Sequence, residues 1–156
     1  MAMPEPEVVS LEATGVRVRL RWAPPSAWEL ESEPDWTGLE GIRLVSAVFE
    51  DGATLGVAAV RPRDARGHGD DAVAARFLDA EGALMATSDA LLSVEYDSSS
   101  MPRRLGIELW PDADSAPLRI AADREPGDVD DRDAVDLTFR LGGVAGRGIY
   151  ETLREG

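Results

Sequence analysis

Short stretches of alternating apolar and polar residues run along most of this chain. Residues 15–22 read GVRVRLRW, so Val16, Val18 and Leu20 point one way and the arginines between them point the other. A period of two residues is typical of a β-strand with one buried and one solvated face. About ten short strands are predicted in this way. The later ones are GIRLVSAVF, ATLGVAAV, DAVAARFL, ALMA, ALLSVEY, RLGIELW, PLRIAA, AVDLTFRLGG and GRGIYETL.

Turn signals separate these stretches at an even spacing. Asp51-Gly52 and Glu81-Gly82 each stand between two predicted strands, and the first pair suits a two-residue type I′ hairpin. A helix competes only over residues 71–86, which are rich in alanine. The glycines of GGVAGRG, residues 142–148, predict a kink or bulge that lets a sheet curl. We therefore predict one all-β domain over residues 1–156, an antiparallel β-barrel, with a β-sandwich as the alternative.

One segment interrupts the alternation. Residues 23–41 contain three prolines and two tryptophans without a clear period, which predicts an irregular connection. On one interpretation, Trp28 and Trp36 are gates over a barrel mouth and help to bind a ligand. On the other, the two indoles plug a barrel end and belong to the core, the commoner use of tryptophan.

Charge and composition exclude several classes of function. The formal net charge is −14, which disfavours nucleic acid and anionic membrane surfaces as partners. All sixteen basic residues are arginines, and cysteine and lysine are absent. The chain therefore has no disulfide, no thiolate site and no Schiff-base lysine. The N-terminal residues lack the features of a signal peptide, and no apolar run is long enough to cross a membrane, so we expect a cytoplasmic protein.

The only histidine, His68, lies in RGHGDD, a polar loop between two predicted strands. A transition-metal site would need further histidines or cysteines, so no metal is predicted. An acid–base pair with Asp70 is one hypothesis, because histidine titrates near neutral pH and a carboxylate can orient it. An ordinary surface loop is the other.

A second candidate acid lies in the last predicted strand, GIYETL. Glu151 shares a face with Ile149 and Leu153, whereas Tyr150 lies on the opposite face. If the face of Ile149 points inward, Glu151 is a carboxylic acid in an apolar interior with a raised pKa. If Tyr150 points inward, Glu151 is solvated and inert, and we favour this arrangement.

The order of motifs between Gly41 and Glu151 resembles a known family. A hairpin around FEDGATL, a polar loop with RGH, a strand pair around EYDSSSMPRRLGIELW, a strand PLRIAA and a closing FRLGGVAGRGIYE follow one another. This order is similar to that of the lipocalin-like half-barrels of the carotenoid hydratase and tocopherol cyclase-like group. Members usually carry two barrels, and this chain has room for one. The resemblance implies an isoprenoid or similarly apolar ligand, with acid-assisted hydration or cyclisation in some members. Glu151 and His68 are the positions it would assign to catalysis.

Two hypotheses about function follow. In the first, a lipocalin-like barrel binds a hydrophobic small molecule, isoprenoid- or polyketide-like, without a cofactor. Trp28, Trp36, Trp110 and Tyr150 would line the pocket, and Glu151 or His68 would supply a proton if the protein is an enzyme. In the second, the chain is a non-enzymatic β-sandwich that meets a protein partner. The sequence leaves a homodimer open.

Overall fold

The structure of the chain is a computed structural model that describes residues 8–21, 27–66, 70–112, 114–124 and 134–153. Twelve β-strands and one short 3-10 helix form in these residues. The all-β prediction is confirmed. The helical alternative over residues 71–86 is wrong, because this stretch forms two paired strands instead.

The strands form two antiparallel sheets. Nine of them make one large sheet in the order β7-β6-β5-β4-β12-β11-β10-β9-β8, and the other three make a small sheet in the order β1-β2-β3. The strands of the large sheet are β4 (Leu39–Phe49), β5 (Thr54–Pro62), β6 (Ala72–Leu78), β7 (Leu84–Thr87), β8 (Ala90–Tyr96), β9 (Pro102–Leu109), β10 (Leu118–Arg124), β11 (Ala134–Leu141) and β12 (Val144–Leu153). Those of the small sheet are β1 (Val8–Ala13), β2 (Val16–Arg21) and β3 (Ala27–Leu30).

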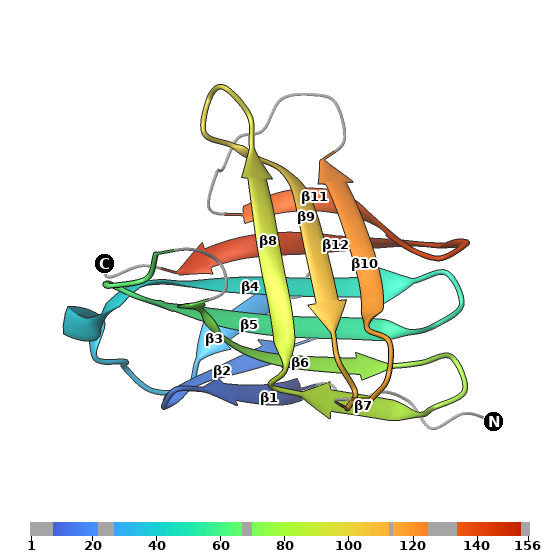
Figure 1. Cartoon of the computed structure of the whole chain (residues 1–156), viewed down its shortest axis with the longest axis horizontal. Helices are drawn as coiled ribbons and strands as arrows, with labels where there is room; N and C mark the ends of the chain where they lie inside the picture. Colours follow the sequence, from blue (N-terminus) through green and yellow to red (C-terminus); the bar gives the residue numbers. More distant parts are fainter. Residues whose placement is uncertain (1–7, 22–26, 67–69, 113, 125–133, 154–156) are drawn as a thin grey trace.

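The large sheet curls into a nearly closed barrel. Strands β8, β9 and β10 cross β4, β5 and β6 steeply, as Figure 1 shows. The face enclosed between them is apolar and holds the larger core, with Phe139 and Leu92 fully buried at its centre. We call it the inner core. The barrel prediction is thereby confirmed over the sandwich alternative.

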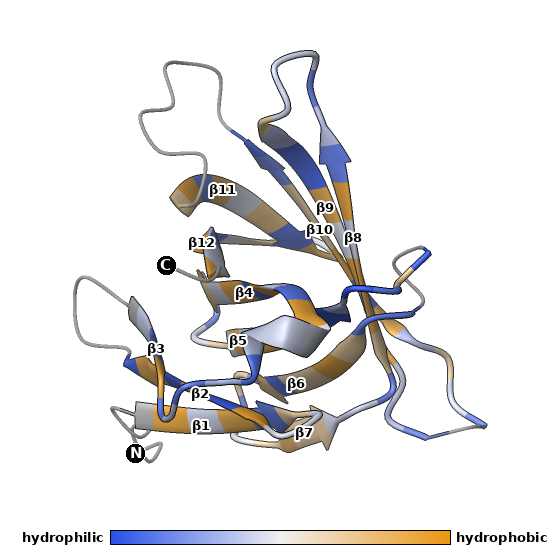
Figure 2. Cartoon of the chain, turned by 90° about the vertical axis from the view of Figure 1, so that its left-hand side faces the viewer, coloured by the Kyte–Doolittle hydropathy of each residue, from blue (hydrophilic) through white to orange (hydrophobic). Residues whose placement is uncertain are grey.

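The small sheet covers the other side of β4, β5 and β6 (Figure 2). In β2 the exposed and buried positions alternate strictly, so Val16, Val18 and Leu20 are buried as the sequence pattern predicted. These side chains meet Leu44 and Ala58, which point outward from the barrel. We call this second cluster the outer core. Because β4 and β5 face a core on both sides, buried residues follow one another along most of each strand instead of alternating with exposed ones.

The turns at both predicted glycine positions exist, although their geometry differs from the expected type I′. In the first, the Phe49 amide donates to the Ala53 carbonyl at 2.8 Å, which leaves a three-residue loop. Within that loop only Gly52 has a positive φ, of 92°, whereas a type I′ turn needs two such residues. The turn at Gly82 repeats this arrangement. Glycine at the third loop position is what a type I turn followed by a left-handed residue requires.

Two glycines of the GGVAGRG stretch lie inside β12, where this strand comes very close to β4. A Cβ atom at Gly148 would lie 2.0 Å from the backbone oxygen of Ser46. At Gly146 it would lie 2.7 Å from the ring of Phe49. Both distances are shorter than any ordinary carbon contact, so only glycine allows the two backbones to approach this closely. The pairing of β12 with β4 and β11 keeps one register through these glycines, so the predicted bulge is absent there and close strand approach is what requires them.

In the segment 23–41, which was expected to be irregular, the described residues contain regular elements. These are β3 and a 3-10 helix, η1 (Trp36–Gly38), before β4 begins at Leu39. The side chain of Asp35 accepts the Thr37 amide and starts the helix. The sequence did not predict β3, because its four residues are too few to show a clear period and stand in a proline-rich segment. No helix among the described residues has the length and apolar character needed to cross a membrane.

Candidate functional site

The inner face of the barrel changes its chemistry at one end. Along β4 the residues that point inward are Phe49, Ala47 and Val45, and the next residue in phase is Arg43. Along β5 the inward residues end in the same way with Arg61, which follows Ala59. Because neighbouring strands are antiparallel, the start of β4 and the end of β5 meet at one rim. Two arginines therefore lie side by side there.

Three other residues, two in strands and one directly before β6, join them by the same rule. Asp71 is in phase with Val73 of β6, Tyr96 with Val94 of β8, and Thr152 with Tyr150 of β12. Together with Glu40, these side chains form a polar group at one end of the inner core. We call this group the mouth cluster, and its members are Glu40, Arg43, Arg61, Asp71, Tyr96, Tyr150 and Thr152.

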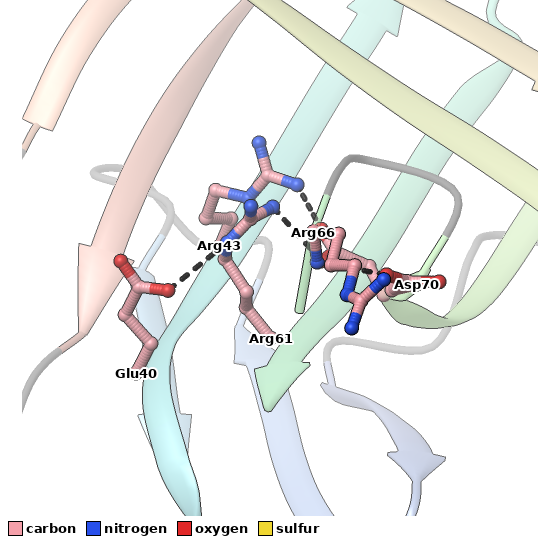
Figure 3. Close-up of polar contacts among 6 residues, drawn as sticks. Glu40, Arg43, Arg61, Arg66 and Asp70 are labelled. Carbon is pink, nitrogen blue, oxygen red and sulfur yellow. Dashed lines mark hydrogen bonds and ion pairs between the residues drawn. The ribbon is translucent and has the colours of Figure 1, made fainter. Parts of the chain in front are cut away.

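A carboxylate holds the two arginines in place. Arg43 Nη2 donates to one oxygen of Asp71, and Arg61 Nη1 donates to the other at 3.2 Å. Arg61 Nε also donates to Glu40 at 3.1 Å, and Figure 3 shows these contacts. The side chain of Asp71 is only 1% exposed and that of Arg43 only 8%, whereas Glu40 is 59% exposed. The buried part of the cluster thus contains two guanidinium groups and one carboxylate.

A pocket of about 300 Å³ opens in front of this group. Its walls are the members of the mouth cluster other than Asp71, together with Gly41. Asp71 lies behind the arginines, so a molecule in the pocket would meet their guanidinium groups rather than the carboxylate. A second hollow lies at the other end of β4 and β12, around Val48 and Arg147. It is lined in part by exposed side chains and does not contain the buried ion pairs.

Tyr150 forms the floor where the pocket meets the inner core. Its side chain is 1% exposed. Burial raises the pKa of its hydroxyl to about 12, and the neighbouring Tyr96 adds to this effect, whereas the charge of Arg43 opposes it. The hydroxyl therefore keeps its proton at physiological pH. It can donate a hydrogen bond but is a very weak acid.

The structure separates the candidate residues of the GIYETL strand. Tyr150 pairs in register with Val45 and points into the inner core. Glu151 pairs with Leu44, whose side chain belongs to the outer core, so Glu151 lies half-buried on the outer face. The two side chains are thus on opposite sides of the sheet, and only Tyr150 reaches the pocket.

In the RGHGDD loop, His68 lies outside the described residues. Asp70 is exposed and accepts the backbone amide of Arg66 at 2.8 Å, a contact within the loop that is visible in Figure 3. Its neighbour Asp71 is the aspartate that reaches the arginines. Asp71 could have been chosen from the sequence, because it is in phase with the buried residues Val73, Ala75 and Phe77.

The three tryptophans that were predicted to bind a ligand do not line the pocket. Trp28 and Trp36 are buried in the outer core, and the indole nitrogen of Trp36 donates to Glu33 at 2.7 Å. Trp110 follows the end of β9, next to the start of β8. Tyr96 and the pocket lie at the opposite end of β8. Among the described residues, no group of three or more histidine or acidic side chains is arranged to hold a metal ion.

Arg43, Arg61, Asp71 and Tyr96 did not emerge from the sequence as candidates. A usable signal existed, because each is the polar or aromatic residue that continues the period-two series of buried positions at a strand end. A charge in phase with a buried face is unusual, since buried charges are costly unless paired. The local pattern did not show that these strand ends lie next to one another in the fold.

The sequence matches no family model and no curated protein. The fold does match a solved structure, that of a protein from Nitrosomonas europaea described as a candidate AttH. The TM-score is 0.58 at 20% sequence identity. The likeness covers 81% of this chain but only 42% of the other, so this chain spans less than half the length of that protein. At this identity the comparison shows the fold alone, which is lipocalin-like.

Proposed function

We propose that this chain binds a small molecule that has an apolar body and one polar end, with the polar end in the pocket of the mouth cluster. A barrel of this kind is compatible with small-molecule binding. The observation that carries the proposal is the change along the inner face, from apolar side chains to a pocket lined by Arg43, Tyr150 and Thr152. Isoprenoid- or polyketide-like molecules combine an apolar body with a polar end in this way.

The proposal is for binding rather than for catalysis. Acid-assisted hydration or cyclisation needs a proton donor beside the bound molecule. Among the described residues, Glu151 lies on the outer face, and Tyr150 has a pKa of about 12. The carboxyl group that does line the pocket, Glu40, is 59% exposed and bonded to Arg61. The carotenoid hydratase and tocopherol cyclase-like resemblance therefore supports the proposed class of ligand more directly than it supports a reaction.

Two measurements test the proposal. Native mass spectrometry of freshly purified protein should detect a co-purifying small molecule. Nile red, a neutral apolar dye, should bind with a blue shift of its emission. Thr152→Trp should block the pocket and abolish this shift, whereas Leu84→Trp, at an exposed position on β7, should leave it unchanged. Equal dye binding by Thr152→Trp and the wild type would move the site elsewhere. The absence of both dye binding and a co-purifying molecule would overturn the proposal.

A further inference from the structure

Arg43 is a buried cation in a strand that is otherwise apolar on its inner face. Its side chain is 8% exposed, and the next inward residues are Val45 and Ala47. Desolvation of a guanidinium costs several kcal/mol unless charges and hydrogen bonds compensate for it. An aliphatic residue here would extend the inner core at no such cost. The position of Arg43 therefore calls for a reason other than packing.

The hydrogen bonds of Arg43 within the protein are incomplete. Asp71 accepts one Nη2 hydrogen bond. Nε is buried, and among the described residues no group accepts its hydrogen. A guanidinium has five N–H donors, and an unsatisfied buried donor costs about 1–3 kcal/mol. Arg43 thus lines the pocket with a guanidinium group whose hydrogen bonds within the protein are incomplete.

The charges around the pocket favour an anion. Arg43 and Arg61 share Asp71, so the buried group carries one excess positive charge. The remaining carboxylate, Glu40, is 59% exposed and is bonded to Arg61 Nε, where water screens it. The hydroxyl groups of Tyr96, Tyr150 and Thr152 add hydrogen-bonding capacity on the other walls.

We infer that the polar end of the ligand is a carboxylate, held by the guanidinium groups of Arg43 and Arg61, so that the barrel selects apolar carboxylic acids. This inference rests on the function proposed above and adds the chemical class of the ligand. A planar carboxylate matches the donor fork of arginine. Its single negative charge balances the one excess positive charge of Arg43, Arg61 and Asp71. A multiply charged anion fits less well, because the whole chain already has a net charge of −14.

The test compares two ligands that differ only in their polar end. Dodecanoate and dodecan-1-ol displace Nile red from the wild-type protein at neutral pH, and the ratio of their dissociation constants is measured. We expect dodecanoate to bind at least about tenfold more tightly, the size of a charge-assisted hydrogen bond. Arg61→Gln should reduce this preference by about tenfold, because it should weaken the binding of the acid more than that of the alcohol. Arg43→Lys, which keeps the charge but removes the fork, should reduce it as well.

Arg140→Gln is the matched control, because Arg140 is 63% exposed on β11 and pairs with Asp123 outside the pocket. It should leave the preference unchanged. Arg61 is 23% exposed against 8% for Arg43, so Arg61→Gln is expected to fold even where variants at Arg43 do not. Equal affinity for acid and alcohol in the wild type would overturn the carboxylate while leaving the binding function intact. A preference that survives in Arg61→Gln would overturn the assignment to this site. Failure of Nile red and both ligands to bind would overturn the proposed function itself.

Discussion

The two faces of β4 and β5 are both buried, yet they end differently. On the outer face, apolar side chains continue to the rim, and the outer core includes Trp28 of the small sheet and Trp36 of η1. A Cβ at Gly56 would lie 3.6 Å from the ring of Trp28, so the indole packs directly on the strand. On the inner face, the apolar series gives way to Arg43 and Arg61 and to a pocket.

This difference teaches where to look for function in a barrel of this kind. The tryptophans Trp28 and Trp36 pack in the outer core and do not line the pocket. The smaller set of polar residues at the end of the inner face combines burial, charge and space. Burial by itself does not distinguish the outer core from the mouth cluster. The change from apolar to charged side chains along the inner face does.

The largest effect is expected from Trp28→Ala in the outer core. Removal of a buried tryptophan side chain should lower the free energy of unfolding by about 3–5 kcal/mol, measured by urea denaturation. The preference for dodecanoate over dodecan-1-ol should remain under conditions where the variant is folded. Trp28→Phe should cost less than about 1.5 kcal/mol, because among the described residues no group accepts the Trp28 Nε1 hydrogen. A loss of ligand selectivity in Trp28→Ala would erase the distinction between the two regions.

Asp71→Asn should affect both stability and binding. Loss of the buried carboxylate leaves two guanidinium groups without their shared partner, and we expect a loss of about 2–3 kcal/mol on urea denaturation. The same change frees positive charge toward the pocket, so dodecanoate should bind more tightly than to the wild type. Asp70→Asn is the control, because Asp70 is exposed in the same loop and should change stability by less than about 0.5 kcal/mol. Weaker dodecanoate binding by Asp71→Asn would contradict the charge argument.

Ionisation of Tyr150 should lower the stability of the folded protein at alkaline pH. Its pKa is about 12 in the folded protein against an ordinary value of 10.0, so the unfolded chain releases this proton first as the pH rises. The contribution is complete below pH 10 and declines between pH 10 and pH 12, by about 2–3 kcal/mol in total. Unfolding curves measured across this range should show a shallower decline for Tyr150→Phe than for the wild type. Parallel curves would mean that the hydroxyl is not buried at the pocket floor.

The smallest effect is expected from Glu151→Gln. Glu151 points away from the pocket, so dodecanoate affinity should be unchanged and the free energy of unfolding should change by less than about 1 kcal/mol. Fluorescence titration with Nile red and urea denaturation measure the two quantities. A marked fall in affinity would connect the outer face to ligand binding and would revive the carboxylate of Glu151 as a functional group.

Much of the fold could be predicted from local patterns, whereas the site could be predicted only in part. The alternation of Val16, Val18 and Leu20 with arginines identified a strand and its buried face. Glycine identified the turn at Gly52, although the loop length changed the turn type. Tyr150 was selected as a ligand-binding candidate, and it does line the pocket. Trp28 was a ligand-binding candidate with a core position as the alternative, and the structure shows the core position. The sequence did not decide between the two, because Trp28 lies in β3, a strand too short for its alternation to be recognised.

The sequence by itself determined that the chain is made of antiparallel strands, since the period of its side chains sets which residues share a face. It also excluded thiolate, disulfide and Schiff-base chemistry, since cysteine and lysine are absent. Only the tertiary structure decided which faces look inward and which strand ends meet. Arg43 lies in β4, Asp71 directly before β6 and Tyr96 at the end of β8. Their proximity depends on long-range pairing that no local period encodes. The physical reason is that a strand records its own pleat in its sequence but not the identity of its neighbours.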